Sequence, residues 1–163
     1  MRQWVFVFAL CLIAVEASAE AFKISGSGSV TPLLSENRIV APDNPQHTMT
    51  LARRTEGNRS TDPNCQTMQV ELVTYGDTVA GTGFQRGHRT QTCPSGDKWF
   101  STYQGTITSV PKQGGAPDVN NEGTWQLTGG TGRYQDARGG GTYKGRLTPQ
   151  GYVYEWEGDV ILK

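Results

Sequence analysis

Apolar and polar residues alternate along most of this chain, which is the pattern of β-strands that bury one face. In residues 65–75, for example, Met68, Val70 and Leu72 fall on the face opposite Glu71. The pattern predicts eight strands, at residues 22–30, 47–53, 65–75, 78–92, 98–107, 123–128, 139–147 and 152–162.

Turn-forming residues separate the predicted strands. Gly76-Asp77 fits a two-residue type II′ hairpin turn, and Pro149-Gln150-Gly151 fits another turn. Residues 54–64 are polar and rich in turn formers, so we expect a mobile loop there. In residues 31–36, Pro32 predicts one short helical turn, because proline suits the first position of a helix.

These elements define an all-β chain with little helix. Eight antiparallel strands with short connections predict an up-and-down β-barrel of the calycin-like type. A sandwich of two sheets is the alternative. Glycine in nearly every long strand favours the barrel, because glycine tolerates bends and the close approach of neighbouring backbones.

The first residues carry the features of a secretory signal peptide. Arg2 precedes an apolar stretch, and Ala17-Ser18-Ala19 is a small-residue cleavage site, so we expect the signal at residues 1–19. Cleavage would leave residues 20–163 as a single β-barrel domain of a secreted or periplasmic protein.

The charge balance excludes two classes of partner. The chain has 15 basic and 15 acidic residues, so it lacks the electrostatic footprint of nucleic-acid binding. No other apolar run approaches the roughly 20 residues of a membrane helix, so we expect no membrane association after signal cleavage.

Cys65 and Cys93 are the cysteines outside the signal, and in an exported protein they predict one disulfide. An ideal hairpin turn at Gly76-Asp77 would place Cys65 opposite His88, so the disulfide requires bulges or a loop excursion. The rival interpretation is a redox or metal pair. We expect no metal site, because there is no C-x-x-C motif and the possible nitrogen ligands are His47 and His88 alone.

A glycine-rich segment carries the one family resemblance. Its sequence is Gly129-Gly130-Thr131-Gly132-x-Tyr134-x-x-Ala137-Arg138-Gly139. It resembles the GGTG-x-[F/Y]-x-x-ARG stretch of the allene oxide cyclase and dirigent β-barrel superfamily. The resemblance covers about residues 123–162.

This resemblance implies a small barrel with a mostly apolar cavity, no metal or organic cofactor, and a trimeric assembly. It also implies that Asp136 and Arg138 border the cavity mouth. The composition is nearest to the bacterial exported members of the superfamily, which have no assigned activity.

Aromatic residues of the later strands are the candidate ligand-binding residues. They either line a pocket for a flat or long-chain apolar ligand or fill the barrel as core. These residues are Trp99, Tyr103, Trp125, Tyr143, Tyr154 and Trp156.

Polar candidates for catalysis are fewer. His88 with Arg86, or Glu71, could act on a ligand if they face the cavity, whereas on the solvent side they have no such role. Glu155 and Glu157 alternate with the aromatic face of the last strand and therefore belong on the outside.

Three functions remain open from the sequence. The first is an exported barrel that binds a small apolar or aromatic molecule, and the second is a cofactor-independent isomerase or cyclase of the allene oxide cyclase type. The third is a non-enzymatic interaction protein with a filled barrel.

Asn58-Arg59-Ser60 has the form of a glycosylation sequon, which predicts a glycan on Asn58 only if the source organism glycosylates exported proteins.

Overall fold

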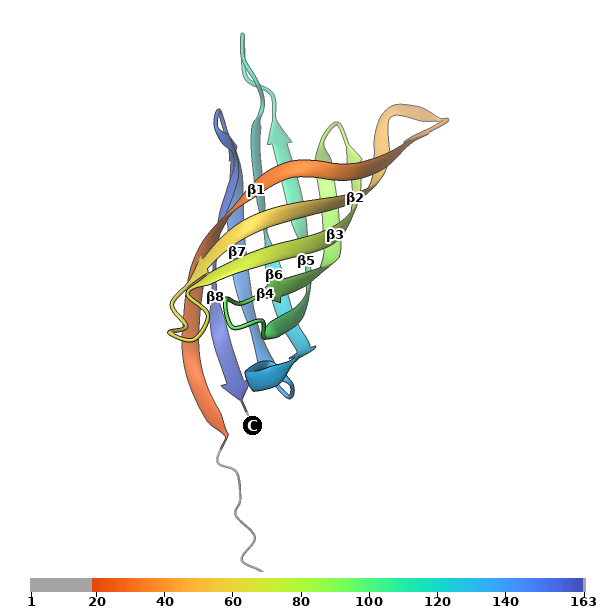
Figure 1. Cartoon of the computed structure of the whole chain (residues 1–163). Helices are drawn as coiled ribbons and strands as arrows, with labels where there is room; N and C mark the ends of the chain where they lie inside the picture. The colour runs from red at the N-terminus through yellow and green to blue at the C-terminus, as the bar shows by residue number, and fades with distance from the viewer. Residues whose placement is uncertain (1–18, 163) are drawn as a thin grey trace, which may run out of the picture.

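The computed structural model describes residues 19–162, which form a closed barrel of eight antiparallel strands in sequence order (Figure 1). The strands are β1 (Glu20–Ala41), β2 (Asn44–Ser60), β3 (Thr67–Val79), β4 (Thr82–Thr92), β5 (Lys98–Val110), β6 (Asp118–Gly130), β7 (Arg138–Thr148) and β8 (Gly151–Leu162). Because β8 pairs with β1, the predicted barrel is confirmed and the sandwich is excluded. Of the expected signal peptide, residues 1–18 lie outside the described part of the chain.

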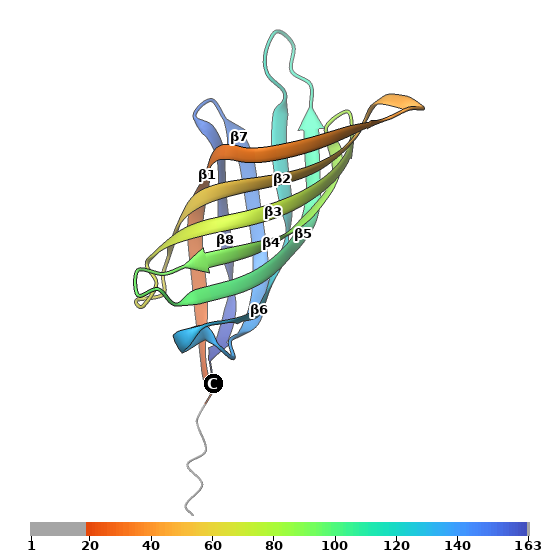
Figure 2. The same ribbon diagram turned by 45° about the vertical axis from the view of Figure 1, so that its right-hand side comes forward.

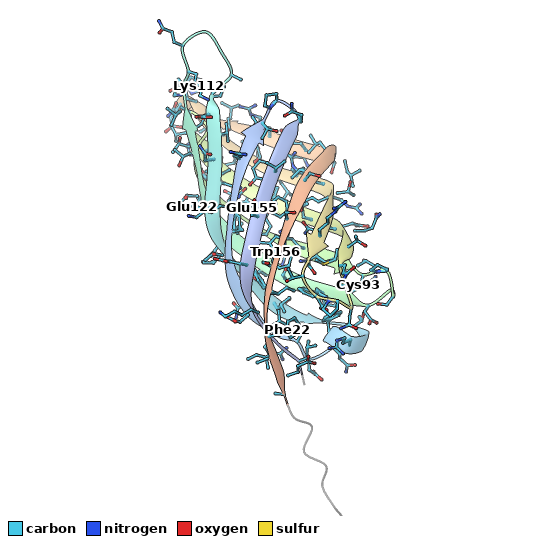
Figure 3. The ribbon with its side chains drawn as sticks, turned by 90° about the vertical axis from the view of Figure 1, so that its left-hand side faces the viewer. Phe22, Cys93, Lys112, Glu122, Glu155 and Trp156 are labelled. Atoms are coloured by element: carbon cyan, nitrogen blue, oxygen red, sulfur yellow. A yellow bond between two sulfur atoms is a disulfide. The ribbon has the colours of Figure 1, made fainter. Side chains whose placement is uncertain are left out.

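The barrel has two dissimilar ends (Figures 1 and 2). At one end, which we call the hairpin end, lie the turns that join β1 to β2, β3 to β4, β5 to β6 and β7 to β8. At the other, the closed end, lie residues 61–66, residues 93–97 and the 3-10 turn η1 (Gly132–Tyr134). Figure 3 shows Lys112 at the hairpin end and Phe22 toward the closed end.

Glycines on neighbouring strands make room for the aromatic rings inside the barrel. A methyl group at Gly28 would collide with Tyr154, and one at Gly26 would collide with Trp156. The same relationship joins Gly87 to Tyr103, Gly105 to Tyr143, Gly145 to Tyr152 and Gly158 to Trp125. An eight-stranded barrel is only just wide enough for its interior side chains, so the glycine density follows from ring packing as much as from bending.

The first hairpin turn of the central strands differs from the prediction. Gly76 and Asp77 lie inside β3, and the turn is at Ala80-Gly81, where both residues have positive φ, 51° and 79°. That pair of angles is the requirement of a type I′ turn. The register places Gln69 opposite Thr92, and this brings Cys65 and Cys93 together just beyond the strand ends.

Cys65 and Cys93 form the predicted disulfide, with their Cα atoms 5.1 Å apart. The bulges that the expected turn at Gly76-Asp77 required are not needed, because the true turn is later. Both cysteines are buried in the core of the closed end.

Two segments expected outside the sheet are strands. Residues 31–36, expected as a helical turn, belong to β1, and residues 54–60, expected as a mobile loop, belong to β2. The interior face of β2 carries Arg54, Glu56 and Asn58, and this polar face hid the alternation from a hydrophobicity pattern. Asn58 is 3% exposed, so its side chain is shielded from a glycosylating enzyme in the folded protein.

The half of the barrel toward the closed end is filled. Trp99 packs on Tyr134 with ring centroids 4.9 Å apart, and Trp125 packs edge-on against Trp156 at 5.7 Å. The hydroxyl of Tyr134 donates to Asp62 over 2.7 Å, which joins η1 to the loop after β2.

Among the described residues, no helix is long and apolar enough to cross a membrane.

Candidate functional site

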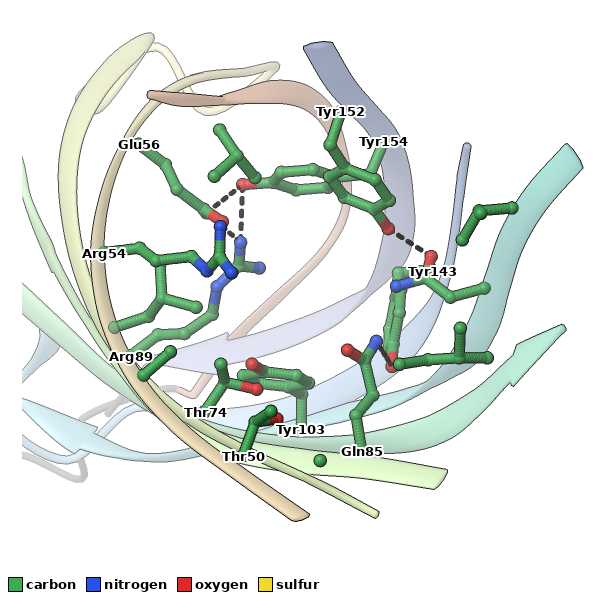
Figure 4. A pocket seen from close by; sticks show the side chains of 17 residues that line it. Thr50, Arg54, Glu56, Thr74, Gln85, Arg89, Tyr103, Tyr143, Tyr152 and Tyr154 are labelled. Atoms are coloured by element: carbon green, nitrogen blue, oxygen red, sulfur yellow. Dashed lines mark hydrogen bonds and ion pairs between the residues drawn. The ribbon is translucent and has the colours of Figure 1, made fainter. Parts of the chain in front are cut away.

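The half of the barrel toward the hairpin end is hollow (Figure 4). Its cavity has a volume of about 270 Å³, near the lower limit of the ~300–1,000 Å³ typical of ligand sites. Apolar walls alternate with polar groups on every side. The lining comprises Val30, Thr50, Ala52, Arg54, Glu56, Leu72, Thr74, Gly76, Gln85, Arg89, Tyr103, Ile107, Val119, Asn121, Tyr143, Tyr152 and Tyr154.

A buried network of charged and polar groups lies against this cavity. Arg89 pairs with the carboxylate of Glu56, and the same guanidinium nitrogen lies 2.5 Å from the hydroxyl of Tyr154. That hydroxyl is also 2.6 Å from Glu56 Oε2 and 2.7 Å from Asn58 Oδ1. The Arg89 and Glu56 side chains are only 13% and 3% exposed, so the ion pair is shielded from water.

Three strands bring this network together across the barrel. Glu56 and Asn58 come from β2, Arg89 from β4 and Tyr154 from β8. Alternation turns each of these side chains inward, because even positions of β2 and odd positions of β4 face the interior. The guanidinium of Arg89 also lies over the rings of Tyr154 and Tyr103, at 4.7 and 5.5 Å from their centroids.

Tyrosine hydroxyls are further polar groups of the cavity lining. Gln85 donates to the hydroxyl of Tyr143 over 3.2 Å, and the hydroxyl of Tyr152 donates to Asn121. Burial raises the pKa of Tyr103 to about 12. Burial likewise raises the pKa of Tyr143, Tyr152 and Tyr154 above the usual tyrosine value, so these hydroxyls stay protonated near neutral pH.

The charge of Arg89 is fixed by its neighbours. Burial acts to lower the pKa of its guanidinium, but Tyr154 and Glu56 outweigh that effect and raise the pKa above the usual arginine value. Glu56 and Arg89 therefore compensate each other inside the barrel. Nε of Arg89 and Nδ2 of Asn58 are buried and have no hydrogen-bond partner among the described residues, so two donors of the network are left over.

Arg54 supplies a second cation to the cavity. Its guanidinium lies 3.6 Å from the carboxylate of Glu36, which is beyond hydrogen-bond distance. Figure 4 shows Arg54 and Arg89 pointing toward Glu56 from the same side of the cavity. Among the residues that line the cavity, two cations thus face one carboxylate.

The structure divides the six aromatic candidates into two groups. Tyr103, Tyr143 and Tyr154 line the cavity. Trp99, Trp125 and Trp156 belong to the packed core and do not line it. Both interpretations that the sequence left open, pocket wall and core, apply, because Tyr143 and Tyr154 line the cavity and also belong to the buried core cluster.

The catalytic candidates do not reach the cavity. His88 and Glu71 are exposed on the outer face, where Glu71 pairs with Arg53 over 2.8 Å. Their strand positions alternate with the inward-facing Arg89 and Leu72, which is the physical reason that they point away. Glu155 and Glu157 are exposed, as expected from alternation.

Asp136 and Arg138 are also placed differently from the implication of the resemblance. They are exposed at the closed end, whereas the cavity lies toward the hairpin end. They therefore do not border the cavity mouth. Arg133, from the same connector, pairs with Glu20 at the start of β1 over 3.0 Å.

Sequence reasoning missed the charged residues of the site, the neighbouring Asn58, and Tyr152, which lines the cavity but was not among the aromatic candidates. Arg54, Glu56 and Asn58 fell in the segment expected as a loop, and Arg89 was passed over for its neighbour His88. One signal was present. Ala52, Arg54 and Glu56 occupy alternate positions and therefore share the inward face of β2, although that face changes from apolar to polar along the strand.

Within residues 19–162, no cluster of histidine, cysteine and acidic side chains is arranged to hold a metal ion.

Comparison of the chain with protein-family models, curated proteins and solved structures finds no match. The resemblance to the allene oxide cyclase and dirigent superfamily therefore stays a prediction.

Proposed function

We propose that this protein is an exported carrier or receptor that binds one small molecule in the cavity at the hairpin end of its barrel. The ligand has a flat, mostly apolar body and at least one hydrogen-bond acceptor. The observation that carries the proposal is a hollow, aromatic-lined chamber next to a buried network with two unused donors.

The shape of the cavity supports a ligand of this class. Tyr103 and Tyr143 meet edge to face with centroids 5.9 Å apart, and Tyr152 stacks on Tyr154 at 6.1 Å. Such rings offer flat apolar faces together with hydroxyl groups at their edges. The cavity favours ligand binding over the third function considered from the sequence, an interaction protein with a filled barrel.

The electrostatics support binding over acid–base chemistry. The raised pKa values keep the cavity tyrosines neutral, so they donate hydrogen bonds and do not act as bases near neutral pH. The carboxylate of Glu56 is held by Arg89 and Tyr154. Groups arranged in this way orient an acceptor on a ligand.

A cofactor-independent isomerase or cyclase remains the second candidate. One observation favours it, namely that the Tyr154 hydroxyl contacts both a cation and a carboxylate and so has a path for a proton. Its test is to incubate the protein with an apolar extract of the producing cells and compare the products by mass spectrometry. A product made by the wild type and lost in Tyr154→Phe would support the enzyme, and identical extracts would exclude it.

Binding is tested by calorimetric titration of the mature chain with 2-naphthol, a flat bicyclic probe with one hydroxyl group. Ile107→Trp adds a ring inside the cavity, and Thr106→Trp adds the same ring on the outer face of the same strand. We expect one site in the wild type and in the Thr106 variant, and at least about a tenfold weaker site in the Ile107 variant. Absence of saturable binding in all three proteins, or equal affinity in all three, would contradict the proposal.

A further inference from the structure

The hairpin of β1 and β2 extends past the neighbouring strands (Figures 1 and 2, in orange). β1 pairs with β8 as far as Ser29, whereas its pairing with β2 continues to Ala41. Residues 33–41 therefore have β2 on one side and no strand on the other side among the described residues. The backbone of this segment presents an unpaired edge.

An unpaired edge that is long and apolar is a template for pairing with another strand. Four large apolar side chains within these residues are exposed: Leu33, Leu34, Ile39 and Val40. Ile39 is 62% exposed, the highest fraction among the exposed large hydrophobic residues described. The register shifts between Val30 and Ser35 interrupt the start of the edge, but from Ser35 to Val40 the ladder with β2 is regular.

We propose that this edge pairs with the same edge of a second copy of this chain, antiparallel and about a two-fold axis at Asn37. The segment reads LLSENRIVA from residue 33 to residue 41. With Asn37 opposite Asn37 of the second copy, Glu36 of each chain comes opposite Arg38 of the other.

Charge complementarity selects the second copy as the occupant. The two-fold axis places two Glu36–Arg38 pairs across one interface, and cross-strand pairs of opposite charge stabilise an antiparallel ladder. The apolar ends also match, because Leu33 and Leu34 at one end of the segment lie toward Val40 and Ala41 at the other end of the segment in the second copy. An edge with one sign of charge would repel its own copy.

The pairing is compatible with the contacts inside each chain. Within a chain Glu36 lies 3.6 Å from Arg54, with both side chains about one-third exposed, 30% and 34%. Solvent access leaves the Glu36 carboxylate free to accept a second cation from the other copy. The inference is independent of the ligand proposed for the cavity.

Charge reversal tests the register by sedimentation equilibrium of the mature chain at tens of micromolar. Glu36→Arg and Arg38→Glu each place like charges opposite one another, and each should weaken the dimer about tenfold or more. The double variant Glu36→Arg/Arg38→Glu restores opposite charges and should return to within about threefold of the wild type. Glu122→Arg, an equal charge change on an exposed position of β6, is the control and should leave the dimer unchanged.

Cysteine cross-linking gives a second, independent readout. Residues directly opposite in an antiparallel pair have Cα atoms about 4.5–5.5 Å apart, which suits a disulfide. Asn37→Cys should therefore form a covalent dimer under mild oxidation. Ser35→Cys, exposed and on the same strand, should not, because Ser35 lies opposite Ile39 of the second copy.

Several results would overturn the proposal. These are a wild type that is monomeric at tens of micromolar, an assembly whose mass the charge reversals leave unchanged, and equal cross-linking at residues 35 and 37. A trimer insensitive to the charge reversals would also overturn it, in favour of the assembly that the family resemblance implies.

Discussion

Nη2 of Arg89 lies 2.5 Å from the hydroxyl oxygen of Tyr154, a residue 65 positions later in the chain. The contact crosses the barrel interior from β4 to β8 and joins a cation to a ring that lines the cavity. Arg89, Glu56 and Tyr154 together form a hydrogen-bonded network inside the barrel, in which the positive and the negative charge compensate each other. The stability of the barrel and the ligand binding that we propose therefore depend on the same residues.

Removing the cation should destabilise the barrel strongly. Arg89→Met leaves the Glu56 carboxylate buried without its partner, and we expect a loss of about 3–5 kcal/mol in the free energy of unfolding. Glu56→Gln/Arg89→Met, which removes both charges, should lose less than Arg89→Met alone. Urea unfolding followed by circular dichroism measures both values.

An exposed ion pair provides the control for this prediction. Arg53 and Glu71 are 55% and 63% exposed, and Arg53→Met should change the free energy of unfolding by no more than about 1 kcal/mol. Equal losses for Arg89→Met and Arg53→Met would show that the buried network is not what stabilises the interior.

The space left by the glycines should be as important for the stability of the barrel as the aromatic side chains that fill it. Gly28→Ala would direct a methyl group into Tyr154 and Asn58, so we expect a loss of about 1–3 kcal/mol. Gly57→Ala, on the adjacent strand, meets no atom within 4 Å and should be close to neutral. Thermal unfolding of the two variants gives the comparison, and a Gly28 variant as stable as the Gly57 variant would contradict the packing described.

The raised pKa values of the buried tyrosines predict that the protein loses stability at alkaline pH. Burial raises the pKa of Tyr103 to about 12 in the folded chain, against the usual value of 10.0 for an unperturbed tyrosine. Because the folded state holds the proton more tightly, the stabilisation is complete below about pH 10 and is lost between about pH 10 and 12. Tyr143, Tyr152 and Tyr154 shift in the same direction and add to the effect.

Tyrosinate absorbance and circular dichroism, recorded together across this pH range, test that prediction. The interior tyrosines should ionise in one step that coincides with unfolding. Gradual ionisation near pH 10 with the fold intact would show that the rings are open to solvent.

The disulfide at the closed end should contribute to the stability of the barrel. It links residues 28 positions apart, and in the chain-entropy model a loop of that size stabilises by roughly 3 kcal/mol. The double variant Cys65→Ala/Cys93→Ala should lower the urea midpoint accordingly, and the wild type in reductant should fall to the same midpoint. A midpoint unchanged by both treatments would contradict this role.

The fold was predictable where burial follows the strand period. In β3 and β8 the apolar residues occupy alternate positions, as at Val70 and Leu72 or Tyr154 and Trp156, and both strands were located from that pattern. Strand β2 was predicted only in part, because its inward face changes from Ala52 to Arg54 and Glu56. A polar interior removes the contrast on which the pattern depends.

The site was predictable only for part of its aromatic wall, because Tyr152, which also lines the cavity, was not among the candidates. Rings on inward positions identify Tyr103, Tyr143 and Tyr154, but their partners Glu56 and Arg89 lie 98 and 65 residues from Tyr154 along the chain. Register sets those contacts, and register depended on a turn at Ala80-Gly81 that the sequence analysis placed four residues too early. Local residue patterns do not contain that long-range information.

Native mass spectrometry of the protein purified from its own producing cells tests the central claim most directly. Wild type and Ile107→Trp are compared, since the added ring occupies the cavity. We predict a stoichiometric excess mass of one small molecule on the wild type and its loss in the variant. Polypeptide mass alone in both proteins, or the same excess mass in both, would contradict the account.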